Sequence, residues 1–244
     1  MNVINAKVKT AVVLAGGPGL RLRPLTRDQP KVMVRVLDKP VLQWVIEWLR
    51  HSGIKRVILG VAYCKEAVMN YFGDGSEFGV EISYSVHSVD GETGEGFRLA
   101  ISRYVSDDVF VAMNGDEITN FILGGMIDFH LRYGYTATIT VTNLRSPFGV
   151  VEVGKNGLVL DFKEKPVIPS VLVNTGIYIF SRGIENYLPE KGPIEETTFP
   201  LLARNKILGG YKMKGTWLTV NTIKDLRLAE STLKRKVEEG KWLK

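Results

Sequence analysis

The sequence predicts an α/β fold whose core is a mostly parallel sheet flanked by helices, and three observations support this prediction. Short apolar runs alternate with helical patterns over residues 9–133, which is typical of parallel strands joined by crossover helices. Two of the apolar runs end directly in glycine-containing loops, at 14–19 and 114–116. The length of 244 residues suits a single large domain.

Residues 1–134 form the first half of this predicted domain, and their elements follow one another as strand and helix. The expected order is strand 9–14, helix 40–50, strand 56–62, helix 65–72, strand 80–86, helix 94–104, strand 109–113 and helix 123–133. The first of these helices is the best defined. Pro40 suits its first turn, Gly53 suits its end, and the apolar side chains Val41, Trp44, Val45, Trp48 and Leu49 share one face.

Residues 135–221 have a different pattern. Strand-like stretches are expected at 135–143, 150–153, 158–162 and 171–180, and they are separated by short turns such as Lys155-Asn156-Gly157. This pattern predicts antiparallel strands that wall one side of a site. A helix over 222–240, within the final segment 222–244, is expected to pack back on the domain.

The composition restricts the class of protein. The net charge is +6, and residues 1–56 hold eleven Lys and Arg against three Asp and Glu. A basic surface can bind nucleic acid or anionic small molecules, but no aromatic residues are interleaved with the basic ones to stack on bases. We therefore expect no nucleic-acid partner.

The location and the membrane association of the chain can also be predicted. No apolar run reaches the roughly 18 residues of a membrane span, so we expect no membrane association. The first ten residues are too short and too polar for a signal peptide. The single cysteine, Cys64, allows no internal disulfide. A cytoplasmic location is expected.

The most informative segment is LAGGPGLRLRPLT at residues 14–26, followed by Lys31. Glycines allow backbone N–H groups to approach phosphate oxygens, while arginine and lysine supply cationic donors. The segment is not a P-loop, because no Lys-Ser or Lys-Thr follows a glycine. It is not the dinucleotide fingerprint either, because Leu22 stands where the third glycine is needed. The segment predicts a polyphosphate site.

The pattern L-A-G-G-x-G-x-R-L-x-P-L-T, followed by P-K-x-M and K-P, resembles the sugar-1-phosphate nucleotidylyltransferases, or NDP-sugar pyrophosphorylases. The match runs without a gap from Leu14 to Pro40. The resemblance implies a Rossmann-like (GT-A-like) mixed sheet with an antiparallel sugar-binding lobe. Residues 1–134 would be the nucleotide-binding half and 135–221 the sugar-binding half. It implies transfer of a nucleotidyl group from an NTP to a sugar-1-phosphate, with release of pyrophosphate.

The resemblance also implies roles for the residues of the first half. Gly16, Gly17 and Gly19 are expected to surround the phosphates of the nucleotide. Leu14 and Ala15 are expected to contact the nucleoside. Arg21 and Lys31 are expected to be catalytic cations that contact the transferred phosphates. Asp116, in Asn114-Gly115-Asp116, resembles the aspartate that binds Mg²⁺, the expected cofactor. Both loops follow the carboxyl ends of strands, where α/β sheets bind ligands, so we expect them to meet in space.

The second half carries three short motifs that resemble the sugar side of the family. Gly149 lies in Phe-Gly-Val-Val, Glu164 and Lys165 lie in Glu-Lys-Pro, and Asn174 and Gly176 lie in Asn-Thr-Gly. The glutamate is expected to bind sugar hydroxyls and Lys165 to bind the sugar's phosphate, a catalytic role. The histidines His51, His87 and His130 follow no metal-ligand spacing and are expected to be surface or structural residues.

The chain departs from the family pattern at two places. Thr219 occupies the position of the second metal-binding aspartate, and Asn221 is expected to project to the same side. Asn221 could offer an oxygen to the metal, or the metal could instead rely on Asp116 and the phosphates. Before the helix at 94–104, Glu92 and Thr93 are expected to lie at the nucleotide. Glu92 and Glu95 could accept hydrogen bonds from guanine, or they could instead be helix N-terminal carboxylates that interact with the helix dipole.

Two functions therefore stand as alternatives. The first is an active enzyme for a mannose-, glucose- or heptose-1-phosphate-like substrate. The second is a paralogue that binds nucleotide or NDP-sugar with little turnover, which the exchange of aspartate for Thr219 favours. Neither the sugar nor the base follows from the sequence. A homo-oligomer, dimer or tetramer, is expected by the resemblance.

Overall fold

Seven strands form the central sheet of the computed structural model, which describes residues 8–243. Residues 1–7, on which the argument against a signal peptide partly depends, and residue 244 lie outside the described range. The strands lie in the order β12-β8-β11-β6-β1-β4-β5. Their bounds are β1 (Thr10–Leu14), β4 (Arg56–Val61), β5 (Glu81–Val86), β6 (Val109–Asn114), β8 (Ala137–Arg145), β11 (Val167–Ser181) and β12 (Leu208–Lys212).

The sheet is mixed, and the mostly parallel arrangement predicted from the sequence is confirmed. Strands β6, β1, β4 and β5 run parallel to one another, whereas β11 runs antiparallel to both β6 and β8. Strand β12, which the sequence pattern does not predict, pairs parallel with β8. The antiparallel strands of the second half thus extend the sheet of the first half.

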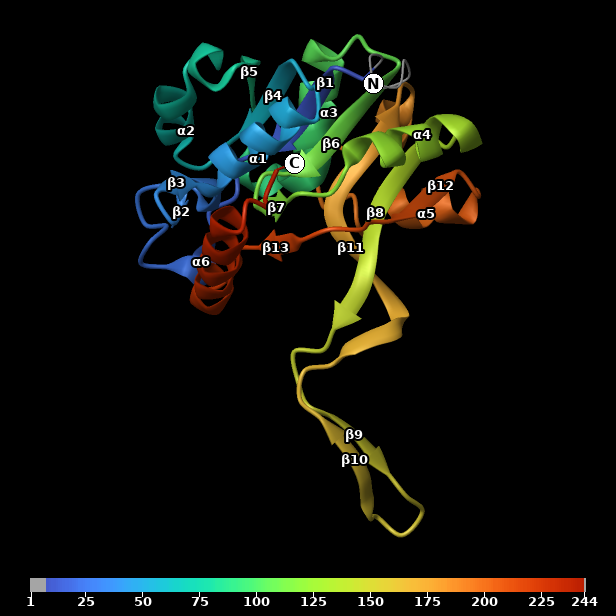
Figure 1. The fold of residues 1–244 in the computed structure, drawn as a ribbon. Coiled ribbons are helices and arrows are strands. Elements are labelled where there is room, and N and C mark those ends of the chain that lie inside the picture. Colours follow the sequence, from blue (N-terminus) through green and yellow to red (C-terminus); the bar gives the residue numbers. More distant parts are fainter. Residues whose placement is uncertain (1–7, 244) are drawn as a thin grey trace.

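Helices cover both faces of this sheet (Figure 1). One face packs against α1 (Val41–His51), α2 (Lys65–Phe72) and α4 (Leu123–Tyr133), and the other packs against α3 (Glu92–Tyr104) and α5 (Thr198–Arg204). Alternation along the strands explains the two layers, because successive side chains point to opposite faces. In β1, Ala11 and Val13 join one core cluster and Val12 joins the other.

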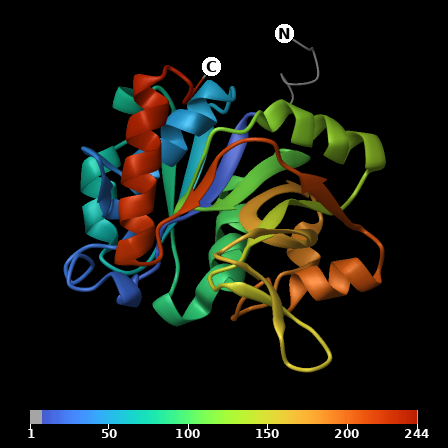
Figure 2. The ribbon, with the colours of Figure 1, turned by 60° about the horizontal axis from the view of Figure 1, so that its bottom comes forward.

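Helix α6 (Ile223–Glu238) packs beside α1 at the edge of the molecule (Figure 2). Thr222 caps it, since its hydroxyl oxygen accepts a hydrogen bond from Asp225 N at 3.2 Å. Leu233 is buried on its inner face, and the rings of Trp44 and Trp242 meet edge to face at 5.9 Å. The helix begins two residues after Asn221, whose backbone N–H donates to Asp225 in the first turn at 3.3 Å.

The remaining strands form three small two-stranded sheets: β2 (Arg35–Val36) with β3 (Lys39–Pro40), β7 (Glu117–Thr119) with β13 (Trp217–Thr219), and β9 (Val150–Val153) with β10 (Val159–Lys163). The β9–β10 hairpin projects far from the body of the molecule (Figure 1). Within residues 8–243, no helix combines the length and the apolar character that crossing a membrane requires.

Candidate active site

The two loops singled out in the sequence meet at the carboxyl ends of neighbouring strands. Leu14 at the end of β1 is in register with Asn114 at the end of β6, and Gly115 N donates to Leu14 O at 2.8 Å. A Cβ on Gly115 would lie 2.7 Å from the same carbonyl oxygen, which is closer than real contacts allow. The absence of a side chain at Gly115 therefore permits the junction, and the expected meeting of the loops is confirmed.

The glycine loop wraps around Lys31. Lys31 N donates to Gly17 O at 3.0 Å, and the hydroxyl of Thr26 donates to Gly19 O at 2.8 Å. Gly19 has a φ of +58°, which L side chains adopt rarely. A Cβ on Gly17 would have no atom within 4 Å. The loop thus presents Gly17 to open space, at the edge of a cleft.

A cleft of about 560 Å³ opens beside these loops, a size typical of small-molecule sites. Eight of the predicted residues line it: Leu14, Gly16, Gly17, Lys31, Glu92, Thr93, Asp116 and Asn221. Six further residues line it that were not predicted: Pro18, Val32, His87, Val89, Asn114 and Glu117. Ala15 is buried next to the cleft, where its N–H donates to Gly60 O at 2.6 Å.

The polar side chains of the cleft converge on Lys31. Its ammonium forms an ion pair with Asp116 and donates a hydrogen bond to Asn221 Oδ1. Arg21 approaches the same oxygen from the exposed side, with 3.4 Å between Nη2 and Oδ1. The amide nitrogen of Asn221 donates to the Thr219 hydroxyl at 2.5 Å. The prediction that Thr219 and Asn221 project together is confirmed.

Glu117, the residue after Asp116, is a buried carboxyl in the wall of the cleft. Burial raises its pKa well above the usual range, and the neighbouring Asp116 charge raises it further. The hydrogen bond from Trp217 and the charge of Lys31 lower the pKa by less. Trp217 Nε1 donates to Glu117 Oε2 at 2.7 Å. The sequence signal for this residue was available, since Glu117 directly continues the Asn-Gly-Asp turn.

The donors in the cleft suit a hard divalent cation. Mg²⁺ prefers oxygen ligands and usually takes one or two carboxylates together with substrate phosphates. Oxygens of Asp116 and Asn221 already converge on one positive charge, the Lys31 ammonium. Among residues 8–243, no group of three or more His, Cys, Asp or Glu side chains is arranged to hold a metal.

The start of α3 lies at the other end of the cleft. Glu92 lines it in a strained backbone conformation, with a φ of +54°. The Thr93 hydroxyl donates to Glu195 at 3.0 Å and accepts from Ile194 N at 2.9 Å. Glu95 instead accepts a hydrogen bond from Ser88 N at 2.8 Å and another from the Ser88 hydroxyl. Of the two carboxylates considered for guanine, Glu92 lines the cleft and Glu95 is bonded to a neighbouring loop.

The predicted sugar residues fall into two groups. Asn174 and Gly176 lie at an irregularity of β11 behind the cleft wall, where a Cβ on Gly176 would lie 3.0 Å from both Asn114 and Glu117. The Asn174 amide donates to Tyr178 at 3.0 Å.

The second group lies on the projecting hairpin, away from the cleft of its own chain. Gly149 and Glu164 are close together there, since a Cβ on Gly149 would lie 3.2 Å from Glu164 Oε2. Lys165 Nζ pairs with Glu164 at 2.8 Å, and the side chain of Glu164 is exposed whereas that of Lys165 is half-buried. The structure therefore brings the nucleotide-side residues together and leaves Gly149, Glu164 and Lys165 apart from them.

Two histidines have well-defined surroundings. His87 lines the cleft, with Nδ1 2.9 Å from Ser88 O, so it is a site neighbour that the spacing argument missed. His130 is buried between the hydroxyls of Thr138 and Ser181, at 2.8 and 2.9 Å, and its predicted structural role is confirmed. Burial lowers the pKa of His130 to about 4.

Comparison with known proteins gives relatives of one kind. The chain is 37% identical over 196 residues to a UTP–glucose-1-phosphate uridylyltransferase of Synechocystis, which covers 73% of this chain and 50% of the relative. It is 33% identical over 222 residues to a mannose-1-phosphate guanyltransferase of Gibberella zeae, covering 88% of this chain and 61% of the relative. This chain thus spans between half and about three fifths of these curated relatives.

A solved structure, HddC from Yersinia pseudotuberculosis, has the same fold. It superposes with a TM-score of 0.73 at 22% identity and covers 93% of this chain and 100% of its own. The family model described as nucleotidyl transferase matches residues 10–236. Because that match spans nearly the whole chain, and the relatives carry sugar-1-phosphate nucleotidylyltransferase names, the chain belongs to the nucleotidyl transferase family, in its sugar-1-phosphate branch.

Proposed function

We propose that this chain transfers a nucleotidyl group from an NTP to a sugar-1-phosphate and releases pyrophosphate. The observation that carries the proposal is the convergence of the glycine loop, Lys31, Asp116 and Asn221 on one cleft at the ends of β1 and β6. Exposed backbone, cations and a carboxylate together suit a bound polyphosphate and its metal. The family to which the chain belongs supports the same reaction class.

In the proposed reaction, an oxygen of the sugar's phosphate attacks the α-phosphorus of the NTP. The new P–O bond forms as the bond between the α-phosphorus and the bridging oxygen to the β-phosphate breaks, and pyrophosphate leaves with that electron pair. Such transfers require little covalent work from the protein, so catalysis consists of alignment and charge neutralisation. The cleft has side chains for both tasks.

Lys31 and Arg21 are the groups proposed to neutralise the phosphates. Both are already directed to one point, the Asn221 oxygen, and Lys31 is mostly buried, which strengthens its interaction with a bound anion. Asp116 and Asn221 would hold Mg²⁺, which when bound supplies positive charge to the phosphate oxygens. Lys31 then exchanges its partners Asp116 and Asn221 for phosphate.

The substrate class is proposed to be a mannose-, glucose- or heptose-1-phosphate with a purine or pyrimidine NTP. Named relatives act on glucose-1-phosphate with UTP and on mannose-1-phosphate with a guanyl donor. Glu92 supports guanine, because a carboxylate in the cleft can accept hydrogen bonds from the N1 and N2 groups of that base.

A second candidate, a nucleotide-binding paralogue with little turnover, has one feature in its favour. Thr219, which offers a neutral hydroxyl where the resemblance places a metal-binding aspartate, is bonded to Asn221 at the cleft. The retained Lys31, Arg21 and Asp116 favour the active enzyme, since pure binding needs no groups that act on the leaving pyrophosphate.

Pyrophosphate release tests the proposal. A panel of ATP, GTP, CTP, UTP and dTTP is combined with glucose-, mannose-, galactose-, N-acetylglucosamine- and heptose-1-phosphates in the presence of Mg²⁺. Release that requires both one NTP and one sugar phosphate is expected, and Lys31→Ala should abolish it. Nucleotide-induced thermal stabilisation without release for any pair would instead support the low-turnover paralogue.

A further inference from the structure

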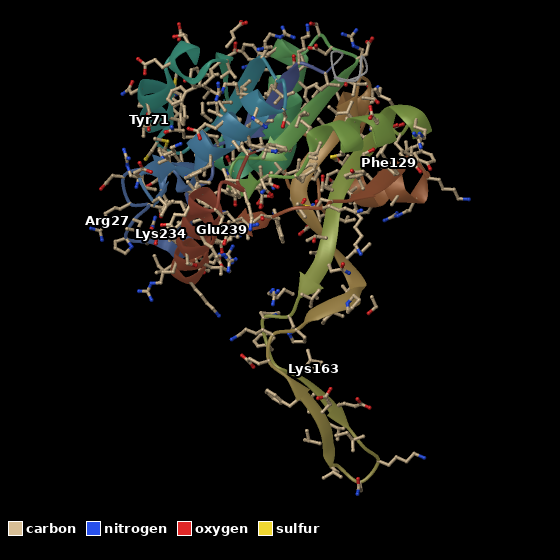
Figure 3. The ribbon with its side chains drawn as sticks, viewed as in Figure 1. Arg27, Tyr71, Phe129, Lys163, Lys234 and Glu239 are labelled. Carbon is tan, nitrogen blue, oxygen red and sulfur yellow. The ribbon has the colours of Figure 1, made fainter. Side chains whose placement is uncertain are left out.

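The β9–β10 hairpin and its stem, residues 148–172, form an arm that exposes an unusual amount of apolar surface. Eleven of the 24 exposed large apolar side chains in the described part of the chain lie in these 25 residues. Phe148 is 75% exposed and Phe162 is 62% exposed. Side chains project from the arm with no other segment beside it, as seen around Lys163 (Figure 3). Within residues 8–243, no segment of the same chain covers the arm (Figure 3).

Both faces of the arm are apolar. Val150 and Val151 are consecutive in β9, and Val159 and Leu160 are consecutive in β10, so each pair places one side chain on each face. A two-stranded hairpin is marginally stable in water unless a hydrophobic face packs on something else. Soluble monomers rarely expose continuous apolar patches of this extent. We therefore expect the apolar surface of the arm to pack against another molecule.

The charge of the arm argues against a nucleic acid or an anionic membrane as its partner. Residues 148–166 carry three acidic and three basic side chains, whereas the whole chain carries +6. Two of the acidic residues already pair within the arm, Asp161 with Lys163 and Glu164 with Lys165. An arm whose charges balance and whose exposed surface is largely apolar fits a surface of a second copy of this chain, and in a two-fold pair each copy gives its arm and receives the other.

The apolar area that the arm exposes is also large enough for a dimer interface. If each of the eleven side chains, on both faces of the arm, loses on the order of 80 Å², one arm buries on the order of 900 Å², against about 800 Å² per partner in a specific interface. The arm alone can thus supply one side of a stable contact between two copies.

The cleft of a single chain has two cationic side chains close to it, Lys31 and Arg21. Among the residues that the structure describes, Lys31 lines the cleft together with Glu92, Asp116 and the buried carboxyl of Glu117, and Arg21 reaches the cleft residue Asn221 from the exposed side. Both cations are proposed to act on the transferred phosphates, and the phosphate of the sugar adds a further anion with which another cation would interact favourably. Lys165 lies on the arm beside Glu164, with a half-buried side chain, outside the cleft of its own chain.

We propose that two copies of this chain exchange their arms, so that each arm packs on the partner and brings Lys165 and Glu164 to the partner's cleft. The contribution to the cleft rests on the proposed function, whereas the exchange of arms rests on the exposed apolar surface alone.

The oligomeric state tests the exchange itself. Sedimentation should give a dimer of about twice the 27.2 kDa chain for the wild type and a folded monomer for Leu160→Glu. Leu228→Glu on α6 is the matched control, because Leu228 and Leu160 are 57% and 58% exposed, and it should remain a dimer. A monomeric wild type, or a Leu160→Glu protein that stays dimeric, would overturn the exchange.

Complementation between two inactive variants tests the shared site. One chain carries Lys31→Ala in the cleft and the other carries Lys165→Ala on the arm, and the two are produced together with different tags. In a mixed dimer with exchanged arms, one cleft receives both lysines, so random pairing should restore about a quarter of the wild-type rate. An arm that serves its own cleft would restore none.

The two proposals can fail separately. A wild type that releases pyrophosphate while the mixture shows no recovery would overturn the shared site and leave the reaction standing. A wild type with no activity would count against the reaction, and the exchange of arms would then be decided by the sedimentation of Leu160→Glu and Leu228→Glu.

Discussion

Glu117 and Thr219 lie directly opposite each other across the β7–β13 pair. Side chains at such positions are about 5 Å apart and share one face, so Thr219 stands beside a buried carboxyl at the wall of the cleft. Position 219 is where the resemblance places an acidic metal ligand. Glu117 and Asp116 together keep two carboxyl groups next to that position.

Thr219→Asp should tighten the dependence of turnover on Mg²⁺. A third carboxyl beside Asp116 and Glu117 increases the negative charge available to the cation, and we expect the half-saturating Mg²⁺ concentration to fall about tenfold, or about 1.4 kcal/mol. A metal titration of the rate measures this. Thr219→Asn, which has nearly the same shape as Thr219→Asp but no charge, is the control, and identical titrations for both variants would show that position 219 is remote from the ion.

Arg21→Ala should reduce turnover by about 10² to 10³-fold, the range for removing one charge-stabilising donor. The fold should be unaffected, because Arg21 is exposed and its hydrogen bond to Asn221 is long, at 3.4 Å. Arg23→Ala, two residues along the same loop and also exposed, should keep its activity. If Arg21→Ala retained more than half the rate, Arg21 would have no place in the mechanism.

Two glycines of the site should respond differently to alanine. In Gly115→Ala the new methyl would meet the Leu14 carbonyl oxygen, so we expect a loss of about 1–3 kcal/mol in the free energy of unfolding. In Gly17→Ala the methyl enters open space at the cleft, so stability should be kept while the KM for NTP rises. Urea unfolding and steady-state kinetics on both variants separate the two effects. Equal stability of the two proteins would contradict the close approach at Gly115.

His130 should make the protein less stable in acid. Above pH 6.5 the residue is neutral in the folded and the unfolded chain, so its full contribution to stability is present. Below pH 6.5, His130 takes up a proton in the unfolded chain, whereas in the folded chain it stays neutral down to about pH 4. The free energy of unfolding therefore falls as the pH is lowered.

The loss from this residue can reach about 3 kcal/mol as the pH drops from 6.5 to 4. His130→Gln removes the titrating group, so its stability relative to the wild type should improve as the pH is lowered from 7.5 to 4.5. Thermal or urea unfolding at several pH values measures the difference. Parallel curves for the two proteins would show that His130 does not contribute.

The sequence predicted the first half of the fold well because its signals are local. The strands and helices from β1 to α4 that the periodicity predicts agree with the structure to within two residues. It missed β12, where Gly209 and Gly210 argue against a strand that pairing with β8 nevertheless forms. It also missed β7, which is three residues long and exists because Trp217–Thr219 pairs with it from 100 residues away.

The positions of the site residues that follow strand ends could be predicted from the sequence. The positions of those on the arm could not, because they depend on the orientation of the arm in the tertiary structure. The glycine loop and the turn with Asp116 were expected to meet, because both follow the carboxyl ends of strands. The direction of the arm was not expected, and the β8–β11 pairing at its base has an irregularity between Ile168 and Leu172 that the sequence pattern does not predict. The motifs that contain Gly149 and Lys165 carry no local sequence pattern that predicts the direction in which the arm projects.

The position of Asn221, immediately before the first turn of α6, links the cleft to the stability of a helix. Its side chain receives Lys31 and Arg21, while its backbone N–H donates to Asp225 at 3.3 Å. Fraying of the first turn of α6 would release both cations from their shared acceptor. A ligand that engages those cations together with Asn221 should therefore slow amide exchange in α6. The end of a surface helix would then report whether the cleft is filled.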